Sequence, residues 1–217
     1  IAVAELMRLL IDQYHVDWDK AWNITTSSVA YTNHTLLPEA LEKWDLGLFN
    51  DLLPRHLEII YEINWRFLQQ LRLRYPGDDK ILRKLSIIDE EGSKSVRMAH
   101  LATIGAHHIN GVAALHSDLI KRQLLPEFAK LWPEKFTNVT NGVTPRRWVA
   151  LSNPSLSTLL ENEVGPDWIT NMELLKKLEE KKDDKHFLQK FEETKLNGKR
   201  KLASFIHSKT GILVDPS

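Results

Sequence analysis

The amino-acid sequence predicts an α/β protein that is unusually rich in helix. Three observations support this class. Long stretches repeat apolar residues at helical spacing, short β-branched segments stand between them, and long helices separate the predicted strands. Strands that are separated by long helices pair in parallel, so we expect a parallel sheet rather than hairpins.

The chain opens with a helix that faces a core, because five apolar residues recur there at helical spacing: Val3, Leu6, Met7, Leu10 and Ile11. Neither an initiator Met nor an N-cap residue precedes this helix. The last residues, 211–217, have the composition of a short strand. We therefore expect the chain to be an internal piece of a larger polypeptide.

Two further helices are long and amphipathic. The clearer one covers residues 54–74, with Pro54 in its first turn and Pro76-Gly77 beyond its end. The other covers residues 183–209, with an apolar side made of Phe187, Phe191, Leu202, Phe205 and Ile206. Its lysine-rich part is interleaved with acids upstream and is typical of a solvated face rather than a nucleic-acid site.

Four short segments are predicted to be strands because they are rich in β-branched and aromatic residues: 28–33, 87–88, 96–104 and 135–139. The second of them runs into a turn of sequence DEEGS. The third and fourth are separated by a long helical stretch, as a parallel sheet requires.

Composition excludes several classes of protein. The 217 residues carry 29 basic and 29 acidic side chains, so the chain lacks the broad positive field that attracts nucleic acids. It contains no Cys, which excludes disulfides and thiolate chemistry. No apolar run approaches the length of a membrane span, and Glu5 and Arg8 interrupt the opening stretch, which is a poor secretory signal. We expect a soluble cytoplasmic protein with neither nucleic acid nor membrane as partner.

Polar residues stand at three places where a predicted strand passes into a helix, the edge at which parallel sheets bind ligands. In residues 31–44, Asn33 and His34 offer the donors and acceptors that sugar hydroxyls need. In residues 109–117, Gly111 allows a close backbone approach. The third stretch, 135–148, contains an Asn-Gly turn and a Thr-Pro helix start.

Spacing alone leaves the role of these segments open. An Asn-Gly after a strand is usually only a turn, and a single His beside Asn is more often structural than catalytic. A zinc site is not predicted, because four of the histidines lack a close His-x-x-x-His pair and an accompanying acid: His100, His107, His108 and His116. Pattern alone therefore supports a soluble α/β protein, with sugar binding as one open function and no metal site expected.

Whole motifs identify the family that this chain resembles. Residues 31–44 read YTNHTLLPEALEKW, residues 109–117 read INGVAALHS, and residues 136–148 read FTNVTNGVTPRRW. In this order and spacing they closely resemble the glycogen, starch and maltodextrin phosphorylases, and the resemblance covers the entire chain. The direct link between Ile87 and Val96 is similar to bacterial members of that family.

The resemblance implies a glycosyltransferase that moves the terminal glucosyl unit of an α-1,4-glucan to inorganic phosphate and yields glucose 1-phosphate with retention. It implies pyridoxal 5′-phosphate as cofactor, used through its phosphate group, and a cytoplasmic, allosteric homodimer. It also implies two doubly wound, Rossmann-like domains of the GT-B type. Residues 1–141 would be the C-terminal part of the N-terminal domain, and residues 142–217 the start of the cofactor-binding domain.

Roles transfer by motif position, as implications of the resemblance. His34 is the expected catalytic residue of the donor glucosyl subsite, with its imidazole near the 6-hydroxyl and its backbone carbonyl near the anomeric carbon. Asn141 is expected to bond the same hydroxyl from the other wall. Val112 packs near the sugar, Glu42 borders the subsite, and Trp148 lines the cofactor pocket.

The family's phosphate-binding segment and cofactor lysine lie beyond this chain, and its acceptor-site residues come before it. The resemblance therefore implies that the chain alone is inactive. One alternative remains from another class, a non-catalytic carbohydrate-binding or assembly module that kept these motifs. The assignment depends on His34 and Asn141 reaching the same hexose.

Overall fold

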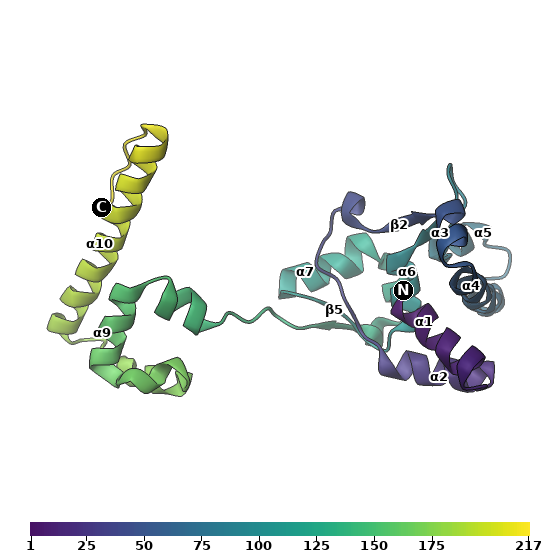
Figure 1. The fold of residues 1–217 in the computed structure, drawn as a ribbon, viewed down its shortest axis with the longest axis horizontal. Coiled ribbons are helices and arrows are strands. Elements are labelled where there is room, and N and C mark those ends of the chain that lie inside the picture. Colours follow the sequence, from purple (N-terminus) through teal and green to yellow (C-terminus); the bar gives the residue numbers. More distant parts are fainter. The chain divides into compact units, whose positions relative to one another are not determined.

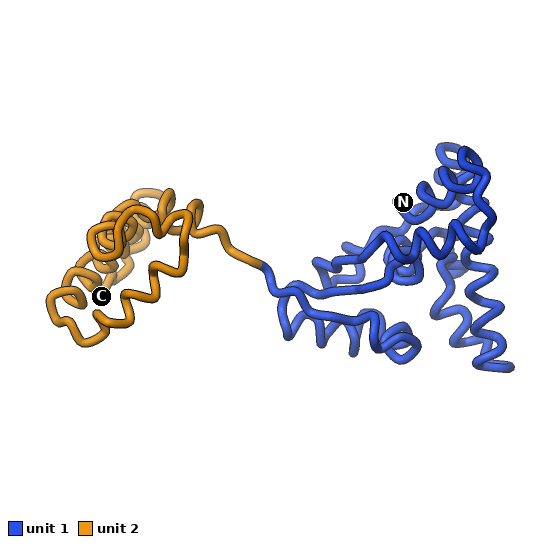
Figure 2. Tube along the Cα trace, turned by 90° about the horizontal axis from the view of Figure 1, so that it is seen from below, with its two compact units in different colours: residues 1–141 blue, residues 142–217 orange.

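The computed structural model describes all residues from 1 to 217, and they form two compact units, residues 1–141 and residues 142–217 (Figure 2). The first unit contains two small sheets and the larger share of the helices, whereas the second contains helices only. The prediction of a helix-rich α/β protein is confirmed. None of the helices is both long enough and apolar enough to cross a membrane.

The first unit begins with three helical segments, of which the first packs against both the central helix and the third segment (Figure 1). They are α1 (Ala2–Arg8), the π-helical turn η1 (Leu9–Gln13) and α2 (Trp18–Ser28). The predicted first helix is confirmed, and Val3, Ala4 and Met7 face the core. The Asp17 carboxylate accepts a hydrogen bond from the backbone N–H of Lys20 and so caps α2.

The central helix of the first unit is α4 (Pro54–Arg74), with the bounds that the sequence predicts. Pro54 occupies its first turn, where no backbone donor is needed. Two shorter helices flank it along the chain, α3 (Leu46–Leu52) and α5 (Asp79–Leu85). Its buried side chains join a hydrophobic core that extends into α1, α5 and α8 and includes Ile60, Phe67 and Leu71.

A parallel three-stranded sheet lies in the same unit, with strand order β1-β5-β6. Its strands are β1 (Tyr31–Thr32), β5 (Ile109–Gly111) and β6 (Phe136–Asn138). Tyr31 pairs with Ile109, and Ile109 pairs with Phe136. The return from β5 to β6 passes through four helical segments: α7 (Ala114–Leu119), η3 (Ile120–Leu124), α8 (Pro126–Leu131) and η4 (Pro133–Lys135). For these strands the predicted parallel pairing is confirmed.

A second sheet is antiparallel, which the sequence analysis did not predict. It has the order β2-β4-β3 and consists of β2 (Lys43–Asp45), β4 (Ser95–Arg97) and β3 (Ile88–Asp89). Strands β3 and β4 are joined by a short turn, in which Gly92 has a φ of 68°. The expectation that hairpins are absent is therefore wrong for this part of the chain.

Two predicted strands are shorter than expected because helices take up part of each segment. Residues 98–104, assigned to a strand from the sequence, belong to α6 (Met98–Gly105), in which the Thr103 hydroxyl donates to the carbonyl of Ala99 over 2.7 Å. Helix α2 likewise reaches Ser28, whose hydroxyl bonds the carbonyl of Ile24. Such bonds to residue i−4 satisfy β-branched and small polar side chains inside a helix.

The second unit is built from five helical segments: η5 (Arg146–Leu151), α9 (Pro154–Val164), η6 (Pro166–Ile169), η7 (Met172–Lys181) and α10 (Lys185–Thr210). The predicted long helix is confirmed as α10, but Leu202 and Phe205 on its apolar side are 58% and 59% exposed. Gly211 ends this helix in the left-handed conformation. Residues 211–217 form no strand, so that expectation is wrong; no neighbouring strand offers them a hydrogen-bonding partner.

Candidate functional site

The carboxyl ends of the three parallel strands meet at one edge of their sheet, and each strand is followed there by polar or exposed residues. The strands are joined beyond their ends by three further backbone bonds, from Asn33 to Asn110, from Val139 to Gly111 and from Asn141 to Val112. All three are between 2.9 and 3.1 Å long. The edge is therefore a hydrogen-bonded extension of the sheet, which fixes the backbone of all three segments.

At the end of β1, the side chains of Asn33 and His34 face different surroundings. Asn33 is buried, and its amide bonds the Tyr31 hydroxyl and the backbone N–H of Thr35. The imidazole of His34 is exposed and has no hydrogen-bond partner in the protein. Both residues are possible sugar ligands by sequence, but the structure leaves only His34 exposed, because Asn33 is buried and each end of its amide bonds a protein group.

At the end of β5, Gly111 and Val112 lie tightly against α7. A Cβ atom on Gly111 would lie 2.5 Å from the Ser117 hydroxyl oxygen and 2.8 Å from the Ser117 backbone nitrogen. The backbone N–H of Val112 donates to Nδ1 of His116 over 3.0 Å, which places the ring proton of a neutral His116 on Nε2. That Nε2 is buried without a partner. Sequence spacing indicated the role of Gly111 but not that of His116.

At the end of β6, the side chain of Asn138 is bonded to protein groups, whereas that of Asn141 is not. The Asn138 carbonyl oxygen accepts from the Ser117 hydroxyl over 2.7 Å, and its amide donates to the Thr140 hydroxyl over 3.1 Å. Asn141 is fixed through its backbone, and its carboxamide is exposed and free of protein partners. The turn predicted at Asn141-Gly142 thus carries an available amide.

The edge therefore combines one free imidazole and one free carboxamide on the segments that follow the two outer strands, with Val112 directly after the middle strand. Neighbouring strands lie about 4.8 Å apart, so the outer two are separated by roughly 10 Å. Both groups can donate to and accept from a hydroxyl. The sequence-predicted residues His34, Val112 and Asn141 are brought to this one edge.

Glu42 and Trp148 are not part of this edge. Glu42 is exposed just before β2 of the antiparallel sheet, where its carbonyl accepts from the backbone of Met98. It lines a shallow hollow of about 600 Å³ formed by residues 38–43 alone. Trp148 belongs to the second unit, within η5, and its indole is 60% exposed.

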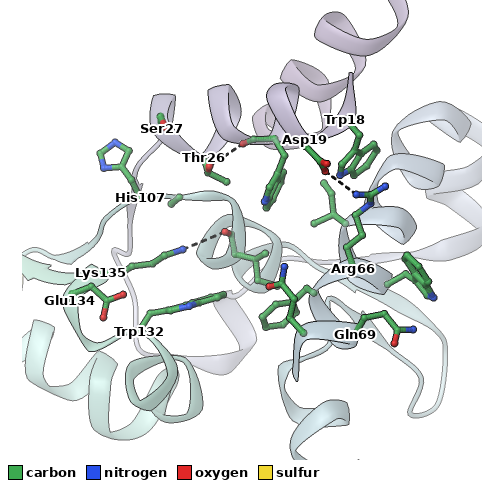
Figure 3. Close-up of a pocket in the computed structure, with 17 residues that line it drawn as sticks. Trp18, Asp19, Thr26, Ser27, Arg66, Gln69, His107, Trp132, Glu134 and Lys135 are labelled. Carbon is green, nitrogen blue, oxygen red and sulfur yellow. Dashed lines mark hydrogen bonds and ion pairs between the residues drawn. The ribbon is translucent and has the colours of Figure 1, made fainter. Parts of the chain in front are cut away.

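A cavity of about 710 Å³ in the first unit lies elsewhere and contains none of the predicted site residues. Its lining includes residues that precede the parallel strands, Ser27, His107 and Lys135, so it lies toward the amino ends of those strands (Figure 3). Four indoles line it as well: Trp18, Trp22, Trp65 and Trp132. The only sign of this cavity in the sequence is the content of 7 Trp in 217 residues, and that number does not show that four of them line one cavity.

Charged groups in this cavity are engaged with its walls. Arg66 bonds Asp19 over 3.1 Å and stacks over the Trp18 ring at 4.9 Å (Figure 3). Lys135 lies 4.1 Å from the centre of the Trp132 ring, and burial lowers the pKa of its ammonium group. Nowhere in the 217 residues do three or more His, Asp or Glu side chains gather in a way that could hold a metal ion.

Comparison with known proteins gives one consistent result. The sequence model described as "Carbohydrate phosphorylase" matches residues 1–217. The chain is 59% identical to a glycogen phosphorylase of Synechocystis sp. over 216 residues, and 50% identical to one of Chlamydia trachomatis. It is 44% identical to the muscle form of human glycogen phosphorylase. Essentially the whole chain is matched each time, but it spans only 25–26% of these relatives' length.

Proposed function

Because the chain belongs to the carbohydrate phosphorylase family, we propose that it supplies one wall of the donor-sugar site of an α-glucan phosphorylase. The reaction is transfer of a glucosyl unit from an α-1,4-glucan to inorganic phosphate, which yields glucose 1-phosphate with retention. The supporting observation is the shared sheet edge, where His34 and Asn141 follow the two outer strands and Val112 follows the middle one. The relatives cited above carry the printed name glycogen phosphorylase.

The roles of the side chains follow from their chemistry. The imidazole of His34 and the carboxamide of Asn141 hold the 6-hydroxyl of the terminal glucose from two sides. The backbone carbonyl of His34 turns the negative end of its dipole toward the anomeric carbon, where positive charge develops as the C–O bond breaks. Val112 covers the sugar ring and excludes water. Glu42 lies beside the antiparallel sheet rather than at this edge, and its proposed role is limited to the border of the subsite.

The proposal also covers the parts that the resemblance implies for the whole enzyme. Residues 1–141 belong to its N-terminal domain and residues 142–217 to its cofactor domain, in a cytoplasmic, allosterically regulated homodimer. The exposed indole of Trp148 is a flat aromatic surface that fits the ring of pyridoxal 5′-phosphate. When bound, that cofactor supplies a phosphate group close to the reacting inorganic phosphate.

The test is substitution of the two converging groups in the phosphorylase polypeptide that contains this chain. His34→Ala and Asn141→Ala each remove a partner from a site built for a hydroxyl, which should cost on the order of 2–4 kcal/mol of transition-state binding. The measurement is kcat/KM for release of glucose 1-phosphate from maltoheptaose. Asn138→Ala would not test the proposal, because the Asn138 amide bonds the hydroxyls of Ser117 and Thr140.

A specificity constant that stays unchanged in both variants would remove the roles proposed for these side chains. The double variant sharpens the result. If the two groups hold one hydroxyl together, the double variant should lose less transition-state binding free energy than the two single variants lose in total. Fully additive losses would indicate that the two side chains act on separate parts of the substrate.

A further inference from the structure

Asn33 is the residue next to the proposed catalytic histidine, and it is 2% exposed. Its Oδ1 accepts a hydrogen bond from the backbone N–H of Thr35 over 3.1 Å, and its Nδ2 donates to the Tyr31 hydroxyl over 3.0 Å. A buried amide with both ends bonded holds a fixed orientation, because rotating it would leave buried polar atoms unpaired. The Asn33 side chain is thus a fixed hydrogen-bonding group on the buried side of the His34 backbone.

The bond to Thr35 determines the direction of the His34 carbonyl. That N–H and that carbonyl belong to one peptide group, which is planar and trans, so the two bonds point in opposite directions. Since the N–H points inward at the buried Asn33 side chain, the carbonyl of His34 points away from it. No donor in the chain bonds this carbonyl oxygen.

No other contact in the chain constrains the His34 peptide as directly. The imidazole has no protein partner, so the side chain does not hold the backbone in place. The preceding amide is anchored, because the Asn33 N–H donates to the Asn110 carbonyl over 2.9 Å. Beyond it, the Thr35 hydroxyl accepts from the backbone of Leu37 in a second local turn. The single bond to Asn33 Oδ1 therefore sets the rotation of the peptide group between these anchors.

We propose that Asn33 is a positioning residue, which aims the His34 carbonyl dipole at the reacting carbon through its bond to the Thr35 N–H. This inference rests on the proposed function, since it needs a substrate that develops positive charge at the edge. It assigns Asn33 no contact with the sugar. Its effect is confined to the transition state, because a neutral ground-state sugar gains little from a carbonyl dipole.

Three variants of the phosphorylase polypeptide with bound cofactor separate positioning from folding. Asn33→Ala removes both bonds. Asn33→Ser also loses the Tyr31 contact but keeps a hydroxyl that can accept from the Thr35 N–H, as Ser does in such turns. Tyr31→Phe removes the Tyr31 contact and leaves the turn intact. Activity is expressed per bound cofactor, so that loss of folded protein does not count as loss of rate.

We expect Asn33→Ala to lower kcat by about 10- to 100-fold with KM for maltoheptaose nearly unchanged, the size of effect that a slight misplacement of a reacting group produces. Asn33→Ser and Tyr31→Phe should stay within about fivefold of the wild-type kcat. A second readout is the inhibition constant of isofagomine, whose protonated nitrogen takes the place of the anomeric carbon. It should rise in Asn33→Ala by about the factor by which kcat/KM falls.

Three outcomes overturn the proposal. One is a wild-type kcat in Asn33→Ala, another is an equal loss in Asn33→Ala and Asn33→Ser, and the third is unchanged inhibition by isofagomine despite a lower kcat. Failure of the proposed function is distinguishable from these, because the wild-type protein would then release no glucose 1-phosphate. An active wild type with an active Asn33→Ala variant defeats the positioning role alone.

Discussion

At the scale of single residues, the carboxyl edge depends on close backbone approach as much as on side-chain chemistry. Gly111 shows this most clearly, since it touches the first turn of α7 at Ser117. Its φ is not positive, so the requirement for glycine is space rather than conformational freedom. The Ser117 hydroxyl in turn bonds Asn138, so a single contact point connects β5, α7 and β6.

Gly111→Ala should therefore destabilise the protein by about 2–3 kcal/mol, the usual cost of forcing a methyl group into a packed site. The added carbon would lie 2.8 Å from the Cα and nitrogen atoms of Ser117, and backbone atoms cannot rotate out of the way. The measurement is urea unfolding followed by circular dichroism. Gly142→Ala is the matched control, because no atom lies within 4 Å of its added carbon. Equal stability of the two variants would contradict this account.

At the scale of elements, the sequence predicts the parallel sheet and the long helices but not the second sheet. Residues 54–74 show a helical repeat on one face and a Pro at the start, so their structure is locally determined. Strand β2 has no alternation, since Lys43, Trp44 and Asp45 are all exposed. It is held by its antiparallel pairing with β4 and by the ion pair between Lys43 and Asp89, which no local pattern contains.

The same limit applies to the candidate site. The motifs make His34 and Asn141 the candidate ligands, because the resemblance of whole segments assigns roles to their positions. They do not distinguish an amide that points outward from one that points inward, so Asn33 reads like a ligand in the sequence and is a buried support in the structure. The orientation of a side chain at a strand end depends on what packs beneath it, here the hydroxyl of Tyr31.

The antiparallel sheet has its own prediction, because one carboxylate joins its three strands. Asp89 on β3 bonds Arg97 on β4 over 2.8 Å and Lys43 on β2 over 2.9 Å. Asp89→Asn leaves the partly buried Arg97 without its counter-charge, so we expect a loss of about 3 kcal/mol at pH 7. Glu90→Gln, which alters an exposed neighbour, should change stability by less than about 0.5 kcal/mol.

The effect of Asp89 should depend on pH in a defined direction. Arg97, with help from Lys43, holds the pKa of the Asp89 carboxyl well below its usual range. Its contribution is therefore fully present above the unfolded-state pKa of about 4, and is lost as the pH falls through the lower folded-state value. Urea unfolding at pH 7 and at pH 2 should show a smaller gap between wild type and Asp89→Asn in acid. A gap that widens in acid would reverse the sign and refute the pairing.

At the scale of the whole molecule, the two units differ in how much apolar surface they bury. The core of residues 1–141 contains 22 buried hydrophobic residues in one cluster. In residues 142–217 the buried hydrophobic residues are only Leu159, Leu160, Trp168 and Phe187. A small core gives marginal stability, because each ordered residue costs conformational entropy and few buried side chains are present to offset that cost.

We therefore expect residues 142–217 to be the less stable unit of the isolated chain. Amide hydrogen exchange followed by mass spectrometry should show faster exchange in α9 and α10 than in α4. Thermal unfolding should likewise begin in the second unit. Trp168 is the one buried Trp of that unit, so exposure of its indole marks unfolding there. Uniform exchange across both units would show that they unfold as one cooperative body.

The order of strands in the parallel sheet also has a consequence during synthesis. Strand β1 leaves the ribosome before its pairing partner, because β5 begins 77 residues after β1 ends and β6 follows later still. At translation rates of 5–20 residues per second, β1 lacks its partner strand for roughly 4–15 seconds. The nascent chain is thus open to chaperones at this strand, and slow codons between β1 and β5 would prolong its exposure.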